Sequence, residues 1–553
     1  MSQAHPLDVL QSYRVGSCGA TTELQRAGAP GIQIDFAVER LVDDVVAGRV
    51  RAVILTGTAG DGKTHLALRI LDALGLDRDA VTGAQQNSAY CKDGYLIDLD
   101  LSAGSLTPER VERLHASLAS PDRLTLVCAN EGKLAELQGA LGRAGRSLPS
   151  AALCINLSRR AIASPDGWAK VLSGVLDGEF WGGSDDLAPG SPLSWNRRWL
   201  GDPGVAERLR RYLLLPYLLG EPITVRETLS FLAYALGGGL SSESASDLPS
   251  HEHLRYRLFN TVFGEPDGYI HGSRSVPNEK LLWWLFRFDP GAQASPGTDL
   301  RLLMDLDRLG TVSPPPGDLL AMRQNDLVVR ESEKSDTSYR ERLARFMRYA
   351  RRWYALASEE GFAAYFPFRH FETFTQALNA TVEERVKLLP GLVQGLNRLL
   401  SGNREDSHKK LYLYHLAGEG SRSSVCIYNT NDPVKASQLS VVTDLELSQE
   451  ADGPADAYLE RFPRRLYLVY DPQPEVRLPI SLLLYEVLQS AAGSEGAFPA
   501  TLWRKERDTV TRFMGALGQA VGADDDEICL TIAGPDKALW ELEHTPGEEL
   551  VVS

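Results

Sequence analysis

The sequence predicts an α/β fold in which a parallel sheet is sandwiched by helices, followed by a helical lid and middle region and a mixed α+β C-terminal domain. Three observations lead to this prediction. Strand and helix patterns alternate over the first 165 residues, the pattern then becomes helical, and short apolar strand patterns return from about residue 411. Alternation of strands and helices is typical of parallel strands joined by crossover helices.

Each element of the first region has a local reason in the sequence. The predicted strands are short runs rich in β-branched and other apolar residues, namely Arg51–Thr56, Tyr95–Leu101, Leu124–Ala129 and Ala151–Leu157. Before and between them, apolar residues recur at helical spacing. This spacing predicts helices over Ile34–Val46, Thr64–Leu74, Pro108–Leu118 and Lys133–Leu141.

The downstream sequence predicts further helices and then strands. Helices are expected at Arg208–Leu219, Thr224–Leu236, Tyr339–Ala357 and Val382–Leu400, and Thr224 to Glu227 has the spacing of a capping box. Strands are expected at Leu411–His415, Ser424–Tyr428, Leu466–Tyr470, Ile528–Ile532 and Ala538–Leu542. With breaks at Gly237–Ser250 and Ser313–Gly317, we predict an α/β core at 1–165, a helical lid region at 166–312, a helical middle region at 318–410 and a mixed domain at 411–553.

Composition narrows the class of protein. A chain of 553 residues has room for several cores, and its formal charge of −15 argues against a large basic surface that wraps DNA. The cysteines lie far apart without CxxC spacing, which fits a reducing cytosol without disulfides or zinc: Cys18, Cys91, Cys128, Cys154, Cys426 and Cys529. We find neither a signal peptide nor an apolar run long enough for a membrane span, so we expect a cytoplasmic protein.

One motif carries specific chemistry. Residues 57–64 have the sequence GTAGDGKT, which matches the phosphate-binding pattern G-x-x-x-x-G-K-[ST], between a predicted buried strand and a predicted helix. The glycines allow backbone N–H groups to face a phosphate, Lys63 would reach the β- and γ-phosphates, and the Thr64 hydroxyl would bind Mg²⁺. The motif therefore predicts a P-loop NTPase that binds ATP or GTP with magnesium through Gly57, Thr58, Ala59, Gly60, Asp61, Gly62, Lys63 and Thr64.

The acid that supports hydrolysis has two candidate positions. We prefer Glu131, after the strand at 124–129, because the strand at 95–101 then takes second place and the acid strand third. Asn156, at the end of the next strand, would then be a polar γ-phosphate sensor, with Asp98 available to help hold magnesium. The alternative makes Asp98 or Asp100 the magnesium acid and Asn130 the sensor.

Three arginines are candidate nucleotide contacts. Arg159 and Arg160 follow the predicted strand at 151–157, and either could reach a nucleotide across a subunit interface. Arg226 opens a lid-like helix and could act as a second sensor. The alternative for Arg159 and Arg160 is a solvated surface charge, and the alternative for Arg226 is an exposed residue in the first turn of its helix.

These features resemble those of the AAA+ and related additional-strand P-loop ATPases. The resemblance covers about residues 30–240, and GTAGDGKT is its specific part. It implies ATP hydrolysis, but Asn130 stands where that family usually has Asp, so slow hydrolysis or a switch function is in play. The segments NEGKL at 130–134 and INLSRR at 155–160 also resemble the P-loop ATPases of DNA-phosphorothioation-dependent restriction and related phage-defence systems.

Two other clusters of residues have both a functional and a structural interpretation. The segment Tyr339–Tyr354 is rich in arginine and aromatic residues, and at helical spacing Arg342, Arg345, Arg348 and Arg352 share a face that could follow phosphates. The preferred interpretation is that the aromatics pack inside and the arginines pair with acids. The His251-Glu252-His253 sequence is not expected to bind metal, because side chains at i and i+2 do not share a helical face.

Two classes of function remain. The first is an ATPase that powers or gates a multi-protein nucleic-acid-processing complex, with other subunits as partners and DNA engaged through that complex. The second is a nucleotide-dependent signalling or assembly scaffold that binds protein partners without contacting DNA.

Overall fold

The structure is a computed structural model that describes residues 5–13, 32–84, 89–92, 94–181, 190–265, 280–311, 314–327, 337–401, 406–415, 426–447, 454–493, 504–522, 528–533, 539–544 and 551–552. Two compact units divide the chain. The first contains residues 1–217, 221–367 and 451–462, and the second contains residues 218–220, 368–450 and 463–553. The division at 367/368 falls inside the predicted middle region at 318–410.

The first unit contains a five-stranded sheet with the order β2-β3-β4-β1-β5. Its strands are β1 (Ala52–Thr56), β2 (Tyr90–Lys92), β3 (Tyr95–Asp98), β4 (Leu124–Cys128) and β5 (Leu153–Asn156). The β3, β4, β1 and β5 strands are parallel, and β2 adds an antiparallel edge. Because β1 and β4 are buried throughout, their continuous apolar runs suit the middle of a sheet that is covered on both faces.

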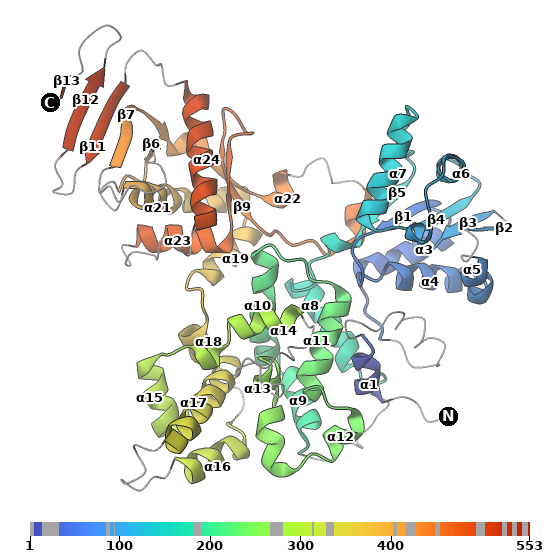
Figure 1. Ribbon diagram of the computed structural model, residues 1–553, viewed down its shortest axis with the longest axis horizontal. Coiled ribbons are helices and arrows are strands. Elements are labelled where there is room, and N and C mark those ends of the chain that lie inside the picture. The colour runs from blue at the N-terminus through green and yellow to red at the C-terminus, as the bar shows by residue number, and fades with distance from the viewer. Residues whose placement is uncertain are drawn as a thin grey trace. The chain divides into compact units, whose positions relative to one another are not determined.

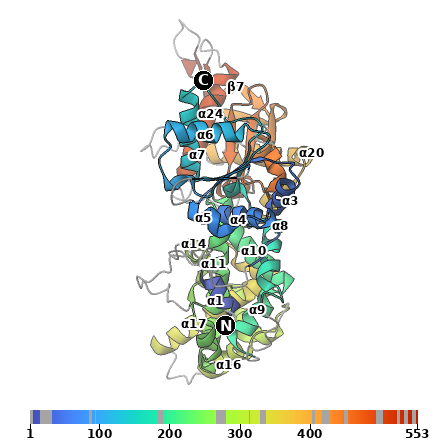
Figure 2. The same ribbon diagram turned by 90° about the vertical axis from the view of Figure 1, so that its right-hand side faces the viewer.

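Helices cover both faces of this sheet (Figure 2). On one face lie α6 (Pro108–Leu118) and α7 (Glu131–Arg143), which bury Leu114 and Leu137 in a core shared with Ile54. On the other face lie α4 (Lys63–Ala73) and α5 (Arg78–Ala84), with α3 (Arg40–Val46) packed against α4. The prediction of an α/β fold with a largely parallel sheet is confirmed.

The rest of the first unit is helical (Figure 1). Its α-helices are α1 (Pro6–Gln11), α8 (Pro165–Leu176), α9 (Pro192–Leu200), α10 (Pro203–Leu218), α11 (Val225–Gly237), α12 (Ser242–Ser246), α13 (Leu258–Thr261), α14 (Lys280–Arg287), α15 (Pro296–Asp305), α16 (Gly317–Asp326), α17 (Thr337–Ala357) and α18 (Glu359–Tyr365). The predicted capping box is present at α11, where the Thr224 side chain and Glu227 each accept from the other's backbone N–H. This cap fixes the start of a helix that contacts the glycine-rich loop.

The second unit combines helices with antiparallel strands. Its helices are α19 (Phe371–Asn379), α20 (Val382–Arg385), α21 (Leu389–Ser401), α22 (Asp444–Leu447), α23 (Leu482–Ala492) and α24 (Arg504–Val521). One sheet has the order β10-β9-β8 and the other β13-β12-β11-β7-β6. The strands are β6 (Lys410–His415), β7 (Cys426–Lys435), β8 (Leu439–Thr443), β9 (Leu466–Tyr470), β10 (Arg477–Ile480), β11 (Ile528–Ala533), β12 (Leu539–His544) and β13 (Val551–Val552).

One short segment departs from this division. Residues 451–462 lie between parts of the second unit in the chain but belong to the first unit, and within them a 3₁₀ helix, η13 (Pro454–Tyr458), packs against β5. The predicted mixed domain at 411–553 is therefore interrupted. Within the described ranges, no helix is long and apolar enough to cross a membrane.

The cysteines with described side chains are free thiols: Cys91 is exposed, Cys154 is half-buried and Cys128 is buried. Cys18 and the side chains of Cys426 and Cys529 lie outside the described residues.

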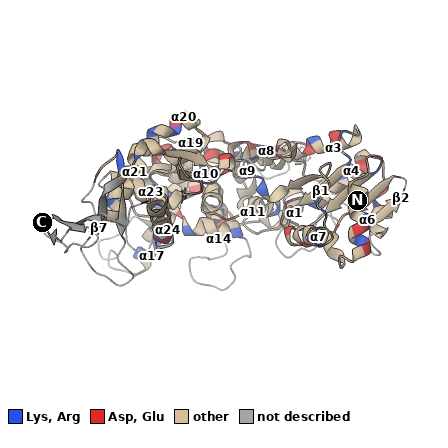
Figure 3. Cartoon of the chain, turned by 90° about the horizontal axis from the view of Figure 1, so that it is seen from above, with Lys and Arg blue, Asp and Glu red and all other residues tan. Residues whose placement is uncertain are grey.

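Basic and acidic residues lie side by side around α3, α4 and α6 (Figure 3).

Candidate functional site

The glycine-rich loop, residues 57–64, lies between the end of β1 and the start of α4. Gly57, Gly60 and Gly62 have φ angles of +136°, +101° and +90°, which residues with a Cβ atom rarely adopt. A Cβ atom on Gly60 would come within 2.9 Å of the Arg226 Cβ atom. The loop therefore needs glycine at these positions, and it leads directly into the N-terminus of α4, where free N–H groups and the helix dipole favour an anion.

Asp61 holds the turn of the loop together. Its buried carboxylate accepts hydrogen bonds from the Thr58 backbone N–H at 2.6 Å and from the Thr58 hydroxyl at 2.9 Å. Burial raises the pKa of Asp61, and the hydrogen bonds from Thr58 oppose this shift. In this loop Asp61 therefore supports the backbone, a role that the motif pattern does not specify.

Lys63 is half-buried within the loop. Its ammonium donates to the Gly57 carbonyl at 2.9 Å and to the Thr58 carbonyl at 2.7 Å. Burial lowers the pKa of Lys63, and the Asp61 carboxylate opposes this shift. A phosphate in the loop would offer this ammonium an anionic partner in place of the two carbonyls.

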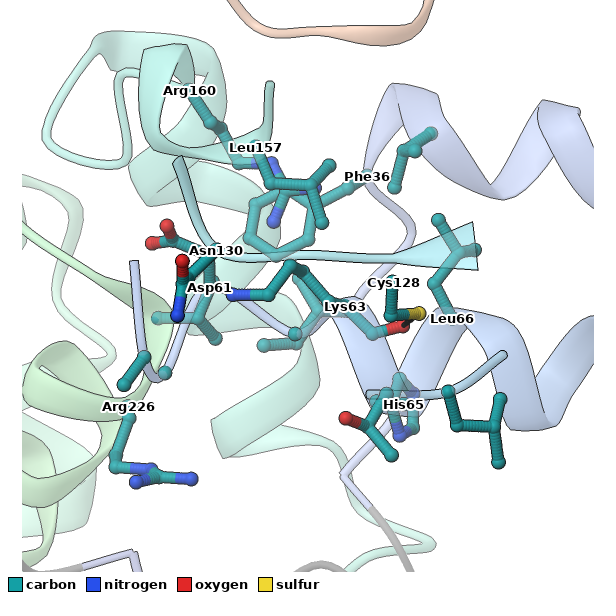
Figure 4. Close-up of a pocket in the computed structure, with 18 of the residues that line it drawn as sticks. Phe36, Asp61, Lys63, His65, Leu66, Cys128, Asn130, Leu157, Arg160 and Arg226 are labelled. Atoms are coloured by element: carbon teal, nitrogen blue, oxygen red, sulfur yellow. Dashed lines mark hydrogen bonds between the residues drawn. The ribbon is translucent and has the colours of Figure 1, made fainter. Parts of the chain in front are cut away.

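A cavity of about 430 Å³ opens over the loop, within the range of small-molecule sites (Figure 4). The loop supplies Lys63 and Thr64, and residues at the carboxyl ends of β3 and β4 line the same space. An apolar wall completes it, which consists of Ile32, Ile34, Phe36, Val38, Leu66 and Leu229. The cavity thus joins a cationic, N–H-rich end to an apolar end, as a ligand with a phosphate group and a flat ring would require.

Two acids lie at the end of β3, and they have different surroundings: Asp98 is the last residue of the strand and Asp100 follows it. Asp98, predicted to help hold magnesium, is buried and forms an ion pair of 2.7 Å with Arg110. It does not line the cavity, whereas Asp100 does. The exposed Asp100 carboxylate accepts from the Ser102 N–H at 2.9 Å and keeps other oxygen lone pairs for a cation.

Asn130 lies close to Asp100 through a shared partner. The Asn130 amide donates to the Ser102 hydroxyl at 2.9 Å, and its oxygen caps α7 by accepting from the Lys133 N–H at 2.7 Å. Asp100, Ser102 and Asn130 all line the cavity. The ends of β3 and β4 therefore present a linked acid and amide opposite the glycine-rich loop.

Glu131 and Asn156, the preferred acid and sensor, are brought together with each other but do not line the cavity. Glu131 accepts from the Asn156 amide at 2.9 Å and from the Ser158 hydroxyl at 2.7 Å. The bonds from Ser158 and Asn156 lower the pKa of Glu131, so its carboxylate stays ionised. Their hydrogen bond joins the start of α7, after β4, to the end of β5, on the two sides of β1.

The three candidate arginines differ in burial and in whether they line the cavity. Arg159 is exposed, whereas Arg160 is buried, lines the cavity and lies over the Phe36 ring with its guanidinium carbon 4.1 Å from the ring centre. The surface-charge alternative is therefore wrong for Arg160. The Arg226 side chain lines the cavity, and its backbone N–H donates to the Gly60 carbonyl at 3.1 Å.

The preferred interpretation of the arginine-rich helix α17 is confirmed for Arg348, Arg351 and Arg352, which pair with acids. Arg352 is fully buried, with Asp289 at 2.6 Å and Glu265 at 2.7 Å. It is therefore not available on an exposed helix face that could follow phosphates. Arg348 also lies near Glu265, at 3.6 Å, while Arg345 is exposed. Among the described residues there is no cluster of His, Cys, Asp or Glu that could hold a metal, including the 251–253 segment.

Comparison of the chain with protein-family models, with curated proteins and with solved structures found no match. Its function therefore has to be argued from the geometry of this cavity.

Proposed function

We propose that residues 57–64 are a P-loop that binds the phosphates of ATP with Mg²⁺, and that the chain hydrolyses ATP. The observation that carries the proposal is the junction of β1 and α4. There, three glycines with positive φ turn the loop into a helix N-terminus beside Lys63 and Thr64, at the carboxyl end of a parallel sheet. This is the site at which open α/β sheets bind ligands, and the helix N-terminus suits a phosphate.

The strand order supports a revised assignment of the other groups. In an additional-strand ATPase, a strand lies between the P-loop strand and the strand that carries the acid. Here β4 occupies that position, between β1 and β3, whereas β5 lies on the other side of β1. We therefore assign Asp100 to magnesium together with Thr64, and Asn130 to the γ-phosphate, in place of the Glu131 and Asn156 assignment.

Calorimetric titration with Mg·ATP tests the nucleotide proposal. Lys63→Ala removes the cation at the phosphates and should weaken binding by at least about 100-fold, since hydrogen bonds to charged groups contribute about 1.5–3 kcal/mol each. Lys133→Ala is the matched control, because Lys133 pairs with Glu136 on α7 at 2.8 Å. Equal affinity in the folded Lys63→Ala variant would refute the P-loop assignment.

We further propose that the nucleotide state gates a multi-protein nucleic-acid-processing complex, of the DNA-restriction or phage-defence kind that the NEGKL and INLSRR segments resemble. The alternative is a nucleotide-dependent scaffold that binds protein partners without DNA. The ion pairs of Arg348 and Arg352 favour this alternative, because these arginines are already matched by acids on neighbouring elements.

A salt titration of DNA affinity separates the two roles. It uses the chain assembled with its partner subunits and ATP, and compares wild type with the Arg340→Ala and Arg345→Ala double variant, since both of these α17 side chains are exposed. Phosphate contacts by these arginines would give a salt slope that flattens in the variant. Identical slopes and affinities would remove α17 from any DNA contact, and absence of DNA binding by the assembled complex would favour the scaffold.

A further inference from the structure

A buried group of charges lies behind the cavity. Glu460, whose side chain is 2% exposed, accepts from the Lys170 ammonium at 2.8 Å and lies 3.4 Å from the Arg160 Nε atom. Arg160 is itself only 5% exposed. The Glu460 backbone carbonyl also accepts from the Ala161 N–H at 2.8 Å. Glu460 thus contacts the segment that follows β5, through its carboxylate at Arg160 and through its backbone carbonyl at Ala161.

The pairing between Arg160 and Glu460 is incomplete. At 3.4 Å, neither the Arg160 Nε atom nor the Glu460 Oε2 atom has a hydrogen-bond partner, although both atoms are buried. These two atoms therefore attract each other by charge without a hydrogen bond between them. A buried cation with an unpaired N–H group would be stabilised further by an anion that can accept a hydrogen bond from it.

Arg160 also faces the cavity, where an anionic ligand could pair with it. Its side chain lines the cavity together with Gly60, Gly62 and Lys63, and it approaches the Phe36 ring in Figure 4. An anionic ligand at the loop would therefore compete with Glu460 for this guanidinium. Arginine is well suited to the exchange because its planar fork binds carboxylate and phosphate with the same geometry.

Glu460 belongs to a segment with a special place in the chain. Residues 451–462 belong to the first unit, where Tyr217 donates to the Phe462 carbonyl at 2.6 Å. The chain before them forms β8 and α22 of the second unit, and the chain after them forms β9. Whatever loosens this segment acts directly on the connection between two paired strands, β8 and β9.

We propose that Arg160 is a nucleotide-contacting residue of the same chain and that Glu460 competes with the triphosphate for it, so that nucleotide binding loosens the 451–462 segment. The inference rests on the proposed nucleotide site and adds its regulation. Coupling between two binding events is reciprocal. If Glu460 weakens nucleotide binding by a given free energy, bound nucleotide must weaken docking of the segment by the same free energy.

The test combines a variant with a measurement on the wild-type chain. Glu460→Gln removes the competing charge with little change of shape, and it should tighten Mg·ATP binding roughly fivefold or more, the lower end of coupling between two sites. Asp166→Asn is the matched control, because Asp166 pairs with the same Lys170 at 3.1 Å from an exposed position. In parallel, hydrogen exchange of residues 454–462 in the full wild-type chain is measured with and without saturating Mg·ATP.

Faster exchange of the segment with Mg·ATP, together with tighter binding by Glu460→Gln, supports the proposal. Unchanged or slower exchange in a wild-type chain that binds Mg·ATP overturns it, whether or not the variant folds, and so does equal affinity in a folded variant. If the wild-type chain binds no nucleotide, it is the proposed function that fails.

Discussion

Asp98 and Asp100 lie two residues apart at the end of β3, and replacement by asparagine should affect a different property at each. We expect Asp98→Asn to lower stability and Asp100→Asn to lower ATP hydrolysis. Asp98→Asn leaves Arg110, whose side chain is 12% exposed, without its counter-charge. Breaking a buried pair from one side costs roughly 3–5 kcal/mol. Because Arg110 keeps some contact with water, we expect the lower end, about 3 kcal/mol.

Asp100→Asn should leave stability nearly unchanged. Asp100 is exposed and caps the short helix that begins at Leu101, and asparagine caps helices as well as aspartate does. The amide binds Mg²⁺ less strongly than the carboxylate, however, because it carries no charge. We therefore expect this variant to lose about 100-fold or more of its magnesium-dependent ATP hydrolysis, as is usual when a positioned catalytic group is removed.

Hydrogen exchange and steady-state hydrolysis together read out both variants. A loss of about 3 kcal/mol should speed exchange of the β3 and β4 amides by about 100-fold in Asp98→Asn, and leave it unchanged in Asp100→Asn. Glu131→Gln completes the series and should retain most hydrolysis. Should Asp100→Asn hydrolyse ATP normally while Glu131→Gln does not, the strand-order argument would be refuted.

Three further predictions concern packing and reactivity. Arg352→Met should destabilise the α17 region by roughly 3 kcal/mol or more, because it removes the cation from buried Asp289 and leaves Glu265 with Arg348 and the Tyr349 hydroxyl alone, whereas Arg348→Ala should cost less than about 1 kcal/mol; equal melting temperatures would contradict this. Burial raises the pKa of Cys128 to about 12, so at pH 8 only about one thiol in ten thousand is ionised. Iodoacetamide should therefore label Cys91 but not Cys128, as checked by peptide mass spectrometry of the native chain. Gly60→Ala should cost about 1–2 kcal/mol of backbone strain and weaken Mg·ATP binding in the same calorimetric assay, and full affinity would show that the positive φ is not needed.

The local elements could be predicted because their patterns are strong. The strands at 52–56, 124–128 and 153–156 fall within the predicted ranges, and the helix at 63–73 starts one residue early. The single helix expected over Val382–Leu400 is instead α20, a 3₁₀ turn at 386–388 and α21. Pro390, at the start of α21, lacks a backbone N–H and favours the first turn of a new helix, a signal that was present in the sequence.

The neighbours of each strand could not be predicted in the same way. Chain order says nothing about which side of β1 a crossover connection returns to, and the roles of Glu131 and Asn130 depended on that choice. Glu460 was missed for a related reason. It lies 300 positions after Arg160 in the chain, and no local pattern marks a lone glutamate as the partner of a distant arginine.

The most direct measurement is a crystal structure of the full chain with Mg²⁺ and a non-hydrolysable ATP analogue. We expect the β- and γ-phosphates within hydrogen-bond distance of the backbone N–H groups at 60–64 and of Lys63, with the metal on the Thr64 hydroxyl and near Asp100. An analogue bound elsewhere, or a loop left empty at saturating concentrations of the analogue, would contradict the assignment of residues 57–64 as a P-loop.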